Sequence, residues 1–321
     1  MPDLSLAVFD QARELIQKAS SILIISHKSP DGDAIGANLA LQEALIRLGK
    51  HTVSACIDPV PSNCLFLNNS FSFVQDFEVK DFDLVITVDC GGHKLIGFQE
   101  KKPELLDRTK VTLLNIDHHP SNDHFGNINL VMSDTPSTCF ILFLMFTYYG
   151  WDISPTMATS LLHGLYYDTG SLMHSNTTAD TLRIVGRLKA KGADHARSIK
   201  EQFHTASIPK LKLWGRALAR ATLNSKNAVV SVITKNDYTE TNTNHEDTSG
   251  LINYLNHVPN AKFCMLLAET ENEQIKGSLR TQDQNIDLSR IAELFGGGGH
   301  KKASGFTING RLVEKRTWGV I

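Results

Sequence analysis

The sequence has few cysteines and almost no net charge, and both shortages exclude classes of protein. Its five cysteines are an odd number, and none of them forms a C-x-x-C pair, which argues against a disulfide framework and a thiolate zinc site. Acidic residues exceed Lys and Arg by two, 34 against 32. A protein that coats long DNA or RNA usually has a large positive excess, because each neutralised phosphate needs a cation. A long nucleic acid is therefore not expected as a partner, although a local basic pocket can hold a short anionic ligand.

Long apolar runs are also missing. The most apolar stretch covers residues 139–146. It is much shorter than the roughly 20 residues that cross a bilayer, and it is predicted to be a buried helix. The first residues, MPDLSLAVFDQARELI, have neither the basic segment nor the continuous apolar segment of a signal peptide. We therefore expect no membrane partner and a location in the cytoplasm, where thiols stay reduced.

What is present is typical of a globular chain with two domains. Hydrophobic residues make up 41% and charged residues 21% of the 321 positions, both near the average for folded domains. At about 150 residues per domain, this length favours two. The pattern becomes polar and weakly periodic after Gly192. We therefore expect a first domain over residues 1–191, a linker over 192–210 and a smaller second domain over 211–321.

The first domain is predicted to contain a parallel sheet. Three continuous apolar runs, SILIIS, LVITV and VTLLNI, are predicted to be buried strands at residues 21–26, 84–88 and 111–116. Helical spacing is found over 34–48, 137–149, 155–166 and 178–191. Buried strands that alternate with helices indicate a parallel sheet that is covered on both faces.

The second domain is predicted to be a smaller α/β unit. We expect a helix over 211–223, a strand over 228–233, neighbouring strands at 262–267 and 274–279, and a short helix over 287–295 that opens with an Asp cap. This last helix runs into four glycines, residues 296–299. Such a run can be a flexible loop, and it also lets the backbone approach an anionic ligand closely.

A turn that contains acids or histidines follows each of these three predicted strands and one helix of the first domain. The first strand is followed by His27, Asp31 and Asp33, and the second by Asp89. The third is followed by Asp117-His118-His119, and the helix that ends near Tyr167 is followed by Asp168. Because the carboxyl ends of parallel strands line one crevice, these four segments are expected to converge.

The chemistry of this set favours two metal ions. Carboxylates packed together repel one another unless cations neutralise them, and mixed imidazole and carboxylate ligands suit Mn²⁺, with Mg²⁺ or Co²⁺ as alternatives. Two such ions about 3.5–4 Å apart can clamp a phosphoryl group and supply a hydroxide. A single Asp in a Gly/Pro turn is usually only a turn former, but four acidic turns in the same relation to apolar segments are hard to produce by chance.

The motifs HKSPDGDAIG, VDC, DHH and DTG, in this order, resemble the four motifs of the DHH phosphoesterase superfamily, and GGGGHKKASGF resembles the glycine-rich motif of the associated DHHA1 domain. The resemblance covers about residues 21–306. It implies an α/β fold, with an N-terminal parallel-sheet DHH domain, a smaller α/β DHHA1 domain and a cleft between them. The length and domain combination resemble the NrnA-like group of bifunctional oligoribonucleases and pAp phosphatases.

The resemblance also implies roles for individual residues. It assigns one Mn²⁺ to His27, Asp31 and Asp89, and the other to Asp33, Asp89, His118 and Asp168. Two residues are expected to be catalytic: His119 would face the scissile phosphate or its leaving group, and Asp117 would orient a histidine. The second domain would bind the far phosphate and base of the substrate through Arg280, Gly297, Gly298, Gly299 and His300.

The function implied is two-metal hydrolysis of short oligoribonucleotides and pApA-type dinucleotides to mononucleotides, and of 3′-phosphoadenosine 5′-phosphate to AMP. A cyclic dinucleotide phosphodiesterase shares both domains, and a catalytically dead nucleotide-binding regulator is an alternative of another class. A family II pyrophosphatase should carry a different second domain, and a processive single-strand exonuclease should carry an added basic track. A homodimer is one option for the oligomeric state.

Overall fold

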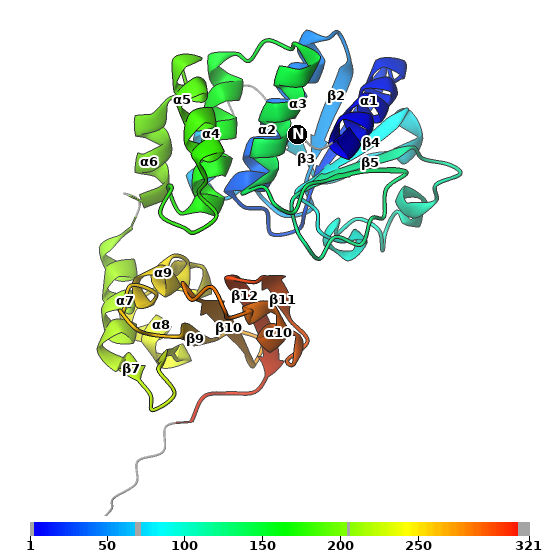
Figure 1. Cartoon of the computed structure of the whole chain (residues 1–321). Helices are drawn as coiled ribbons and strands as arrows, with labels where there is room; N and C mark the ends of the chain where they lie inside the picture. The colour runs from blue at the N-terminus through cyan, green and yellow to red at the C-terminus, as the bar shows by residue number, and fades with distance from the viewer. Residues whose placement is uncertain (1–2, 68–71, 204–205, 314–321) are drawn as a thin grey trace, which may run out of the picture. The chain divides into compact units, whose positions relative to one another are not determined.

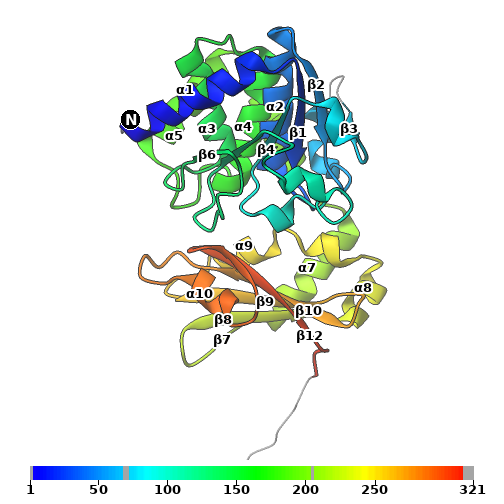
Figure 2. The same ribbon diagram turned by 90° about the vertical axis from the view of Figure 1, so that its right-hand side faces the viewer.

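The computed structural model describes residues 3–67, 72–203 and 206–313. The chain divides into two compact units, Met1–Thr205 and Ala206–Ile321, whose helices and strands are labelled in Figures 1 and 2. The first unit contains a parallel sheet and the second is a smaller α/β unit, so the predicted fold class is confirmed. Within the described residues, no helix is both long and apolar enough to cross a membrane.

The first unit is built on a six-stranded sheet with the order β3-β2-β1-β4-β5-β6, in which all neighbouring strands are parallel. The strands are β1 (Ser21–Ser26), β2 (His51–Ala55), β3 (Phe73–Val74), β4 (Leu84–Val88), β5 (Leu113–Asp117) and β6 (Ile128–Val131). The chain winds outward from β1 to β3 and then returns to place β4 on the other side of β1. Ligands bind at such a switch point, outside the carboxyl ends of the strands.

The register of the three central strands aligns the residues that follow them. Ser26 of β1 is opposite Val88 of β4, and Val88 is in turn opposite Ile116 of β5. Residues that are paired in parallel strands lie at the same height in the sheet. The residues that follow Ser26, Val88 and Ile116 therefore reach the same edge of the sheet. These next residues are His27, Asp89 and Asp117.

Both faces of this sheet are buried, as predicted. Along β1, Ile22 and Ile24 belong to one core, and Leu23 and Ile25 belong to the other. The first core is covered by the helices seen beside the sheet in Figures 1 and 2: α1 (Asp3–Lys18), α2 (Gly32–Arg47), α3 (Thr138–Tyr149), α4 (Pro155–Thr169) and α5 (Ala179–Ala190). The second core is closed by irregular segments and single 3-10 turns, including Val79–Asp81 and Pro103–Leu106.

Helices α2 and α4 approach each other closely through glycines. A Cβ added to Gly164 of α4 would lie 2.7 Å from Oδ1 of Asp33, and one added to Gly36 of α2 would overlap the backbone oxygen of Ser160. Glycine is therefore needed at both positions for this close approach. It lets α4 pass directly beside the first turn of α2, where Asp33 lies.

Two differences from the sequence prediction bear on the site and on the boundary between the units. Helix α4 was expected to end at Tyr166, but it continues to Thr169 and is capped by Gly170 with φ 55°, so Asp168 lies in its last turn and not in a turn after the helix. A helix commonly ends at such a left-handed glycine whatever the apolar pattern before it. The expected linker over 192–210 contains helix α6 (His195–Phe203), which is tied to α4 by a 2.8 Å hydrogen bond between His195 Nδ1 and the Tyr166 hydroxyl.

The second unit has a six-stranded mixed sheet with the order β11-β12-β10-β9-β8-β7. Its strands are β7 (Thr222–Leu223), β8 (Ala228–Ile233), β9 (Phe263–Glu269), β10 (Gln274–Arg280), β11 (Gly298–His300) and β12 (Ala303–Asn309), and its helices are α7 (Ile208–Arg220), α8 (Lys235–Thr241), α9 (Leu251–Leu255) and α10 (Leu288–Glu293). The predicted pairing of neighbouring strands is confirmed, because β9 and β10 are antiparallel partners.

Helices cover both faces of this second sheet. Alternate residues of β9, such as Cys264 and Leu266, pack with α7 and α9, whereas Met265 and Leu267 contact the core that contains α10. The period of two in β9 therefore divides the unit into two cores. The side of the sheet that consists of β10, β12 and β11 packs on the core that contains α10.

Candidate metal centre

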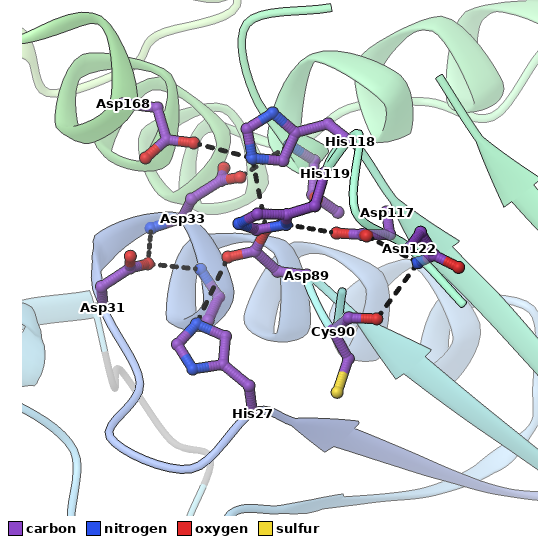
Figure 3. Close-up of polar contacts among 12 residues, drawn as sticks. His27, Asp31, Asp33, Asp89, Cys90, Asp117, His118, His119, Asn122 and Asp168 are labelled. Carbon is purple, nitrogen blue, oxygen red and sulfur yellow. Dashed lines mark hydrogen bonds and ion pairs between the residues drawn. The ribbon is translucent and has the colours of Figure 1, made fainter. Parts of the chain in front are cut away.

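The six side chains predicted to be metal ligands lie together at the carboxyl edge of the first sheet (Figure 3). His27 and Asp89 directly follow β1 and β4, and His118 directly follows β5. Asp31 and Asp33 lie at the start of α2, and Asp168 lies in the last turn of α4. One polar cluster therefore draws on five elements of the fold.

The cluster consists of two overlapping triplets that share Asp89. His27, Asp31 and Asp89 form one triplet and Asp33, Asp89 and His118 form the other, with ligand atoms within 4.8 Å of one another in each. Asp168 joins the second triplet, because its Oδ2 lies 3.1 Å from Nε2 of His118. Three donors around each of two neighbouring points, with one carboxylate common to both, is an arrangement that can hold two divalent cations.

The central residue, Asp89, has a strained backbone. Its φ is 58°, in the left-handed region that is costly for most residues with a side chain but tolerable for Asp and Asn. Its N–H donates to the carbonyl of Ile116 at 3.0 Å, and its Oδ1 accepts a hydrogen bond of 3.0 Å from Oγ1 of Thr138. The chain thus turns sharply at the end of β4, and the buried carboxylate is held by the start of α3.

The two carboxylates of the PDGD turn are fixed by different helices. Asp31 caps α2, and its Oδ1 accepts from the N–H groups of Asp33 at 2.9 Å and Ala34 at 3.1 Å. Asp33 is fully buried, and its two oxygens accept from the N–H groups of Thr138 at 2.6 Å and Cys139 at 3.0 Å. The N-terminus of a helix stabilises such an anion through its N–H groups and its dipole, so the start of α3 stabilises the negative charge of Asp33.

All three histidines turn Nδ1 toward an oxygen atom. His27 Nδ1 lies 2.8 Å from the Lys28 carbonyl, His118 Nδ1 lies 3.4 Å from the Thr135 carbonyl, and His119 Nδ1 lies 2.7 Å from Oδ1 of Asp117. A ring that donates from Nδ1 keeps the lone pair of a neutral imidazole on Nε2, which is how ligating histidines are commonly oriented. In His27 and His118, that Nε2 faces the carboxylate of Asp89, at 3.5 Å and 3.6 Å.

In the absence of cations, the carboxylates of the site have pKa values that are shifted in opposite directions. Burial, together with the charge of Asp89, raises the pKa of Asp31 to about 6, and burial and Asp89 raise the pKa of Asp33 well above its usual range. Burial also acts to raise the pKa of Asp89, but its hydrogen bond to His27 and the charges of the histidines outweigh it and hold that pKa well below the usual range. Of these three carboxylates, Asp89 is therefore the one that stays ionised to the lowest pH.

The pKa of His27, which lies beside Asp89, is shifted upward. Burial lowers the pKa of His27, but the hydrogen bond to Asp89 and the charge of Asp31 outweigh it and raise the pKa to about 10. Protons thus take the neutralising role that cations would have, and a bound cation must displace them. The donor set and its need for positive charge both fit divalent metal ions.

Two side chains that hold this site were not predicted from the sequence. Asn122, which lies in the turn after β5, donates through Nδ2 to Oδ2 of Asp117 at 2.6 Å. Thr138 donates from its hydroxyl to Asp89 and from its backbone N–H to Asp33. The start of a helix at Ser137-Thr138 is a sequence signal for an anion site, but it does not say which anion. Asn122 has no such signal, because only the fold brings its amide to Asp117.

The residues predicted to bind substrate in the second unit also lie near one another. Arg280 of β10 is opposite Ala303 of β12, and His300 of β11 is opposite the same residue on its other side. Residues in register on neighbouring strands present their side chains on the same face of a sheet. The structure therefore places Arg280 and His300 on one face, with a single strand between them.

The three glycines predicted to bind substrate have different structural environments. A Cβ on Gly297 would lie 2.6 Å from Cβ of Phe306, and Gly299 has φ 131° and would meet the carbonyl of Ala303 at 2.7 Å. A Cβ on Gly298 would have no atom within 4 Å. Gly297 and Gly299 are thus required by the packing of β11 on β12, whereas Gly298 borders open space.

Comparison with known families gives two matches. The profile of the DHH family, N-terminal domain, matches residues 21–166, and the profile of the DHHA1 domain matches residues 225–316. The first match contains five of the six predicted ligands and ends two residues before Asp168. The two families predicted from the motifs are therefore confirmed.

Individual relatives are similar over nearly the whole chain. A protein of Thermus thermophilus named bifunctional oligoribonuclease and PAP phosphatase NrnA is 28% identical over 92% of this chain and 86% of its own length. A protein of the same name from Mycoplasma genitalium is 27% identical over 94% of this chain and 92% of its own. The crystal structure of an exopolyphosphatase-related protein from Bacteroides fragilis superimposes with a TM-score of 0.86, at 25% identity, over 96% of this chain and 92% of its own.

Proposed function

The chain belongs to the DHH family of phosphoesterases, with a DHHA1 domain in its second unit, and from this premise we propose that it hydrolyses short phosphorylated nucleotides. The substrates are RNAs of about two to five nucleotides and pApA-type dinucleotides, which give mononucleotides, and 3′-phosphoadenosine 5′-phosphate, which gives AMP. The relatives named oligoribonuclease and PAP phosphatase support both activities. The near-neutral charge of the chain fits short substrates better than long ones.

The observation that carries the proposal is the carboxylate of Asp89, which is common to both triplets. We assign one divalent cation to His27, Asp31 and Asp89, and the other to Asp33, Asp89, His118 and Asp168. Nitrogen and carboxylate donors in this mixture suit Mn²⁺, with Mg²⁺ and Co²⁺ as alternatives. Such a pair of ions, when bound, polarises a phosphoryl group and activates water for the attack on phosphorus.

The protein's own contribution to catalysis is His119, with Asp117 behind it. Nδ1 of His119 is bonded to Asp117, and we assign Nε2 of the same ring to the scissile phosphoryl group or its leaving oxygen. Burial lowers the pKa of His119, but Asp117 and the charge of Asp89 outweigh it and raise the pKa above its ordinary value. A protonated ring can stabilise negative charge on the leaving oxygen or donate a proton to it.

The second unit is proposed to read the rest of the substrate. Arg280 offers a planar fork of donors that suits a phosphate or a base edge, and His300 lies on the same face of the sheet. The open space beside Gly298 lets a ligand approach the backbone of β11. The cytoplasm is the proposed location, because all five cysteines are unpaired and buried.

The proposal is tested by the substrate order of the Mn²⁺-loaded protein. We expect kcat/KM to be highest for pAp, pApA and a 5-mer RNA, and at least about tenfold lower for a 24-mer RNA. Cyclic di-AMP serves as the competitor for the alternative activity, and a reaction without metal is the blank. Faster turnover of cyclic di-AMP than of pApA would identify a cyclic dinucleotide phosphodiesterase, and no turnover of any substrate would identify a nucleotide-binding regulator.

A further inference from the structure

We propose that Asn122 is a positioning residue for hydrolysis, which fixes the orientation of His119 by holding the carboxylate of Asp117. This inference deepens the proposed function and rests on it. Asn122 itself does not touch the substrate. It acts from behind the site, through two hydrogen bonds in series that are drawn in Figure 3.

Both ends of the Asn122 side-chain amide make hydrogen bonds, and their partners show which end is the nitrogen and which is the oxygen. Its Nδ2 lies 2.6 Å from Oδ2 of Asp117, 2.8 Å from Oδ1 of Asn115 and 3.2 Å from the carbonyl of Cys90. Its Oδ1 accepts from the N–H of His124 at 2.8 Å. Three acceptors at one end and a donor at the other leave a single orientation that satisfies the network.

The carboxylate of Asp117 is divided between two partners. It is fully buried, with Oδ1 toward His119 and Oδ2 toward Asn122. If the amide is removed, Oδ2 of this fully buried carboxylate loses its charge-assisted hydrogen bond, which is costly for a carboxylate. The group then gains by turning toward other donors, and the hydrogen bond that aligns His119 is weakened.

The rest of the network explains why Asn122 can act as a rigid support. Asn115 lies in the middle of β5 and donates through Nδ2 to Oγ1 of Thr87, on β4, at 2.9 Å. Asn122 is thus anchored to the two strands whose ends carry Asp89 and Asp117. On the other side, a Cβ on Gly91 would come within 3.1 Å of Cβ of His119, so backbone packs against that ring. A small shift of Asp117 should therefore move the ring of His119, because the backbone at Gly91 is packed closely against this residue.

The matched control is Asn38, another buried asparagine of the same unit. It is fully buried on α2, and its Nδ2 donates to Oγ of Ser26 at 3.0 Å, while its Oδ1 accepts from Oγ of Ser54. Asn38 is not bonded to Asp117 or to any histidine in the hydrogen bonds of the described residues. Asn122→Ala and Asn38→Ala should therefore both lower stability, but for different reasons.

The experiment compares the Mn²⁺-loaded wild type with Asn122→Ala, Asn38→Ala, Asp117→Ala and the double variant Asn122→Ala/Asp117→Ala. We expect Asn122→Ala to lower kcat on pApA about tenfold or more, with KM within about twofold and unchanged metal content. Asn38→Ala should keep kcat near wild type. The double variant should be no slower than Asp117→Ala, since both changes remove the same alignment. Equal losses of kcat in Asn122→Ala and Asn38→Ala, or additive losses in the double variant, would overturn the proposal.

A second readout does not depend on turnover. In ¹⁵N spectra of the Mg²⁺-loaded protein, recorded at an alkaline pH at which the ring of His119 is neutral, His119 should carry its proton on Nδ1 in the wild type and in Asn38→Ala, and should show a mixture of tautomers in Asn122→Ala. An unchanged tautomer in Asn122→Ala overturns the proposal even if kcat falls. Should Asn122→Ala fail to fold, Asn122→Ser gives the same comparison. A wild type that hydrolyses nothing would sink the proposed function, while the tautomer comparison would still decide whether Asn122 fixes the orientation of His119.

Discussion

At the scale of single residues, the site depends on a few side chains whose hydrogen bonds leave them little freedom. Asp89 has φ 58° and is bonded by Thr138, and Asp33 is bonded by the first N–H groups of α3. Such groups are positioned before any cation arrives, so binding does not have to order them. The cost appears as backbone strain at Asp89.

Replacing Asp89 by Asn tests the charge of its side chain separately from its left-handed backbone conformation. Asn tolerates the left-handed region and keeps the shape of the side chain, so Asp89→Asn should fold normally but lose bound metal, and kcat/KM should fall by more than about 100-fold. Asp89→Ala adds roughly 1 kcal/mol of backbone strain and should also be less stable. Metal analysis and thermal unfolding measure the two effects separately. Wild-type turnover of Asp89→Asn in Mn²⁺ would refute a shared ligand.

Thr138 offers a test of the support behind that ligand. Thr138→Val removes the hydroxyl that donates to Asp89 and keeps the shape of the side chain. Metal affinity should fall about tenfold or more, as is typical when an outer hydrogen bond to a ligand is lost. Thr138→Ser keeps the donor and is the matched control, so calorimetric titration with Mn²⁺ should give nearly wild-type affinity for it. Equal affinities for Thr138→Val and Thr138→Ser would mean that the hydroxyl has no such role.

Acid sensitivity is predicted at His163, which lies outside the metal cluster. This fully buried ring packs against Phe66 at 5.1 Å, and burial lowers its pKa from 6.5 to about 4. Because the unfolded chain binds the proton more tightly, the contribution of His163 to stability is present above pH 6.5 and is lost as the pH falls toward 4. The total is about 3 kcal/mol, at roughly 1.4 kcal/mol per pH unit.

The leucine variant isolates this contribution from the other titrating groups. His163→Leu has no proton to bind, so urea unfolding at pH 7 and pH 4.5 should show a smaller loss of stability on acidification than in the wild type. If the two proteins lose the same free energy of unfolding between these pH values, His163 is not an acid-sensitive site.

At the scale of elements, the site is shaped by how closely α2, α3 and α4 pack. Gly164 is one of the points of closest approach, since a Cβ there would lie 2.7 Å from Oδ1 of Asp33. Gly186 on α5 offers the contrast, because a Cβ there would have no atom within 4 Å. The two helical glycines differ only in what surrounds them.

Gly164→Ala and Gly186→Ala should therefore have opposite effects. Gly164→Ala overpacks the start of α3 against Asp33, so we expect a loss of about 1–3 kcal/mol of stability together with weaker metal binding. Gly186→Ala should leave metal binding unchanged and raise stability by up to about 1 kcal/mol, because Ala favours a helix over Gly. Thermal unfolding and metal titration of both variants check this. A Gly164→Ala protein with wild-type stability would mean that the helices can separate freely.

The elements also mark how far the sequence could predict the molecule. Strands β1, β4 and β5 were found because each is a continuous apolar run. His27 and Asp89 were found because each follows such a run directly, and His118 because it is the second residue after one. The pairing of β11 with β12 was not predicted, since its register depends on contacts such as that of Gly297 with Phe306. The same reason hides Asn122, whose partners are chosen by the fold and not by neighbouring sequence.

At the scale of the whole molecule, the two units are proposed to divide the work. The six candidate ligands all belong to the first unit, and Arg280 and His300 belong to the second. The contribution of the second unit should therefore depend on whether a substrate is large enough to contact it. This is a property of the whole chain that neither unit has alone.

Removing Arg280 or His300 tests this division. Arg280→Ala and His300→Ala should keep normal metal content and lose about tenfold or more of kcat/KM on pApA and short RNA, as expected for a charge-assisted contact. They should lose far less on bis-p-nitrophenyl phosphate, which has no second nucleotide to bind. An equal loss on the large and the small substrate would mean that these residues serve chemistry or folding.

The register that aligns β1, β4 and β5 has a consequence for how the protein is made. The candidate ligands extend from His27 to Asp168, and no two of these strands are joined by a short hairpin. Contacts so distant in sequence form late and slowly in folding. A growing chain therefore cannot assemble the full ligand set before α4 has left the ribosome, and a partly synthesised chain cannot be a working hydrolase. The cations proposed for this site would bind only the finished arrangement, so they should also retain it by mass action, and the supply of divalent metal should then help to determine how many of these chains stay folded.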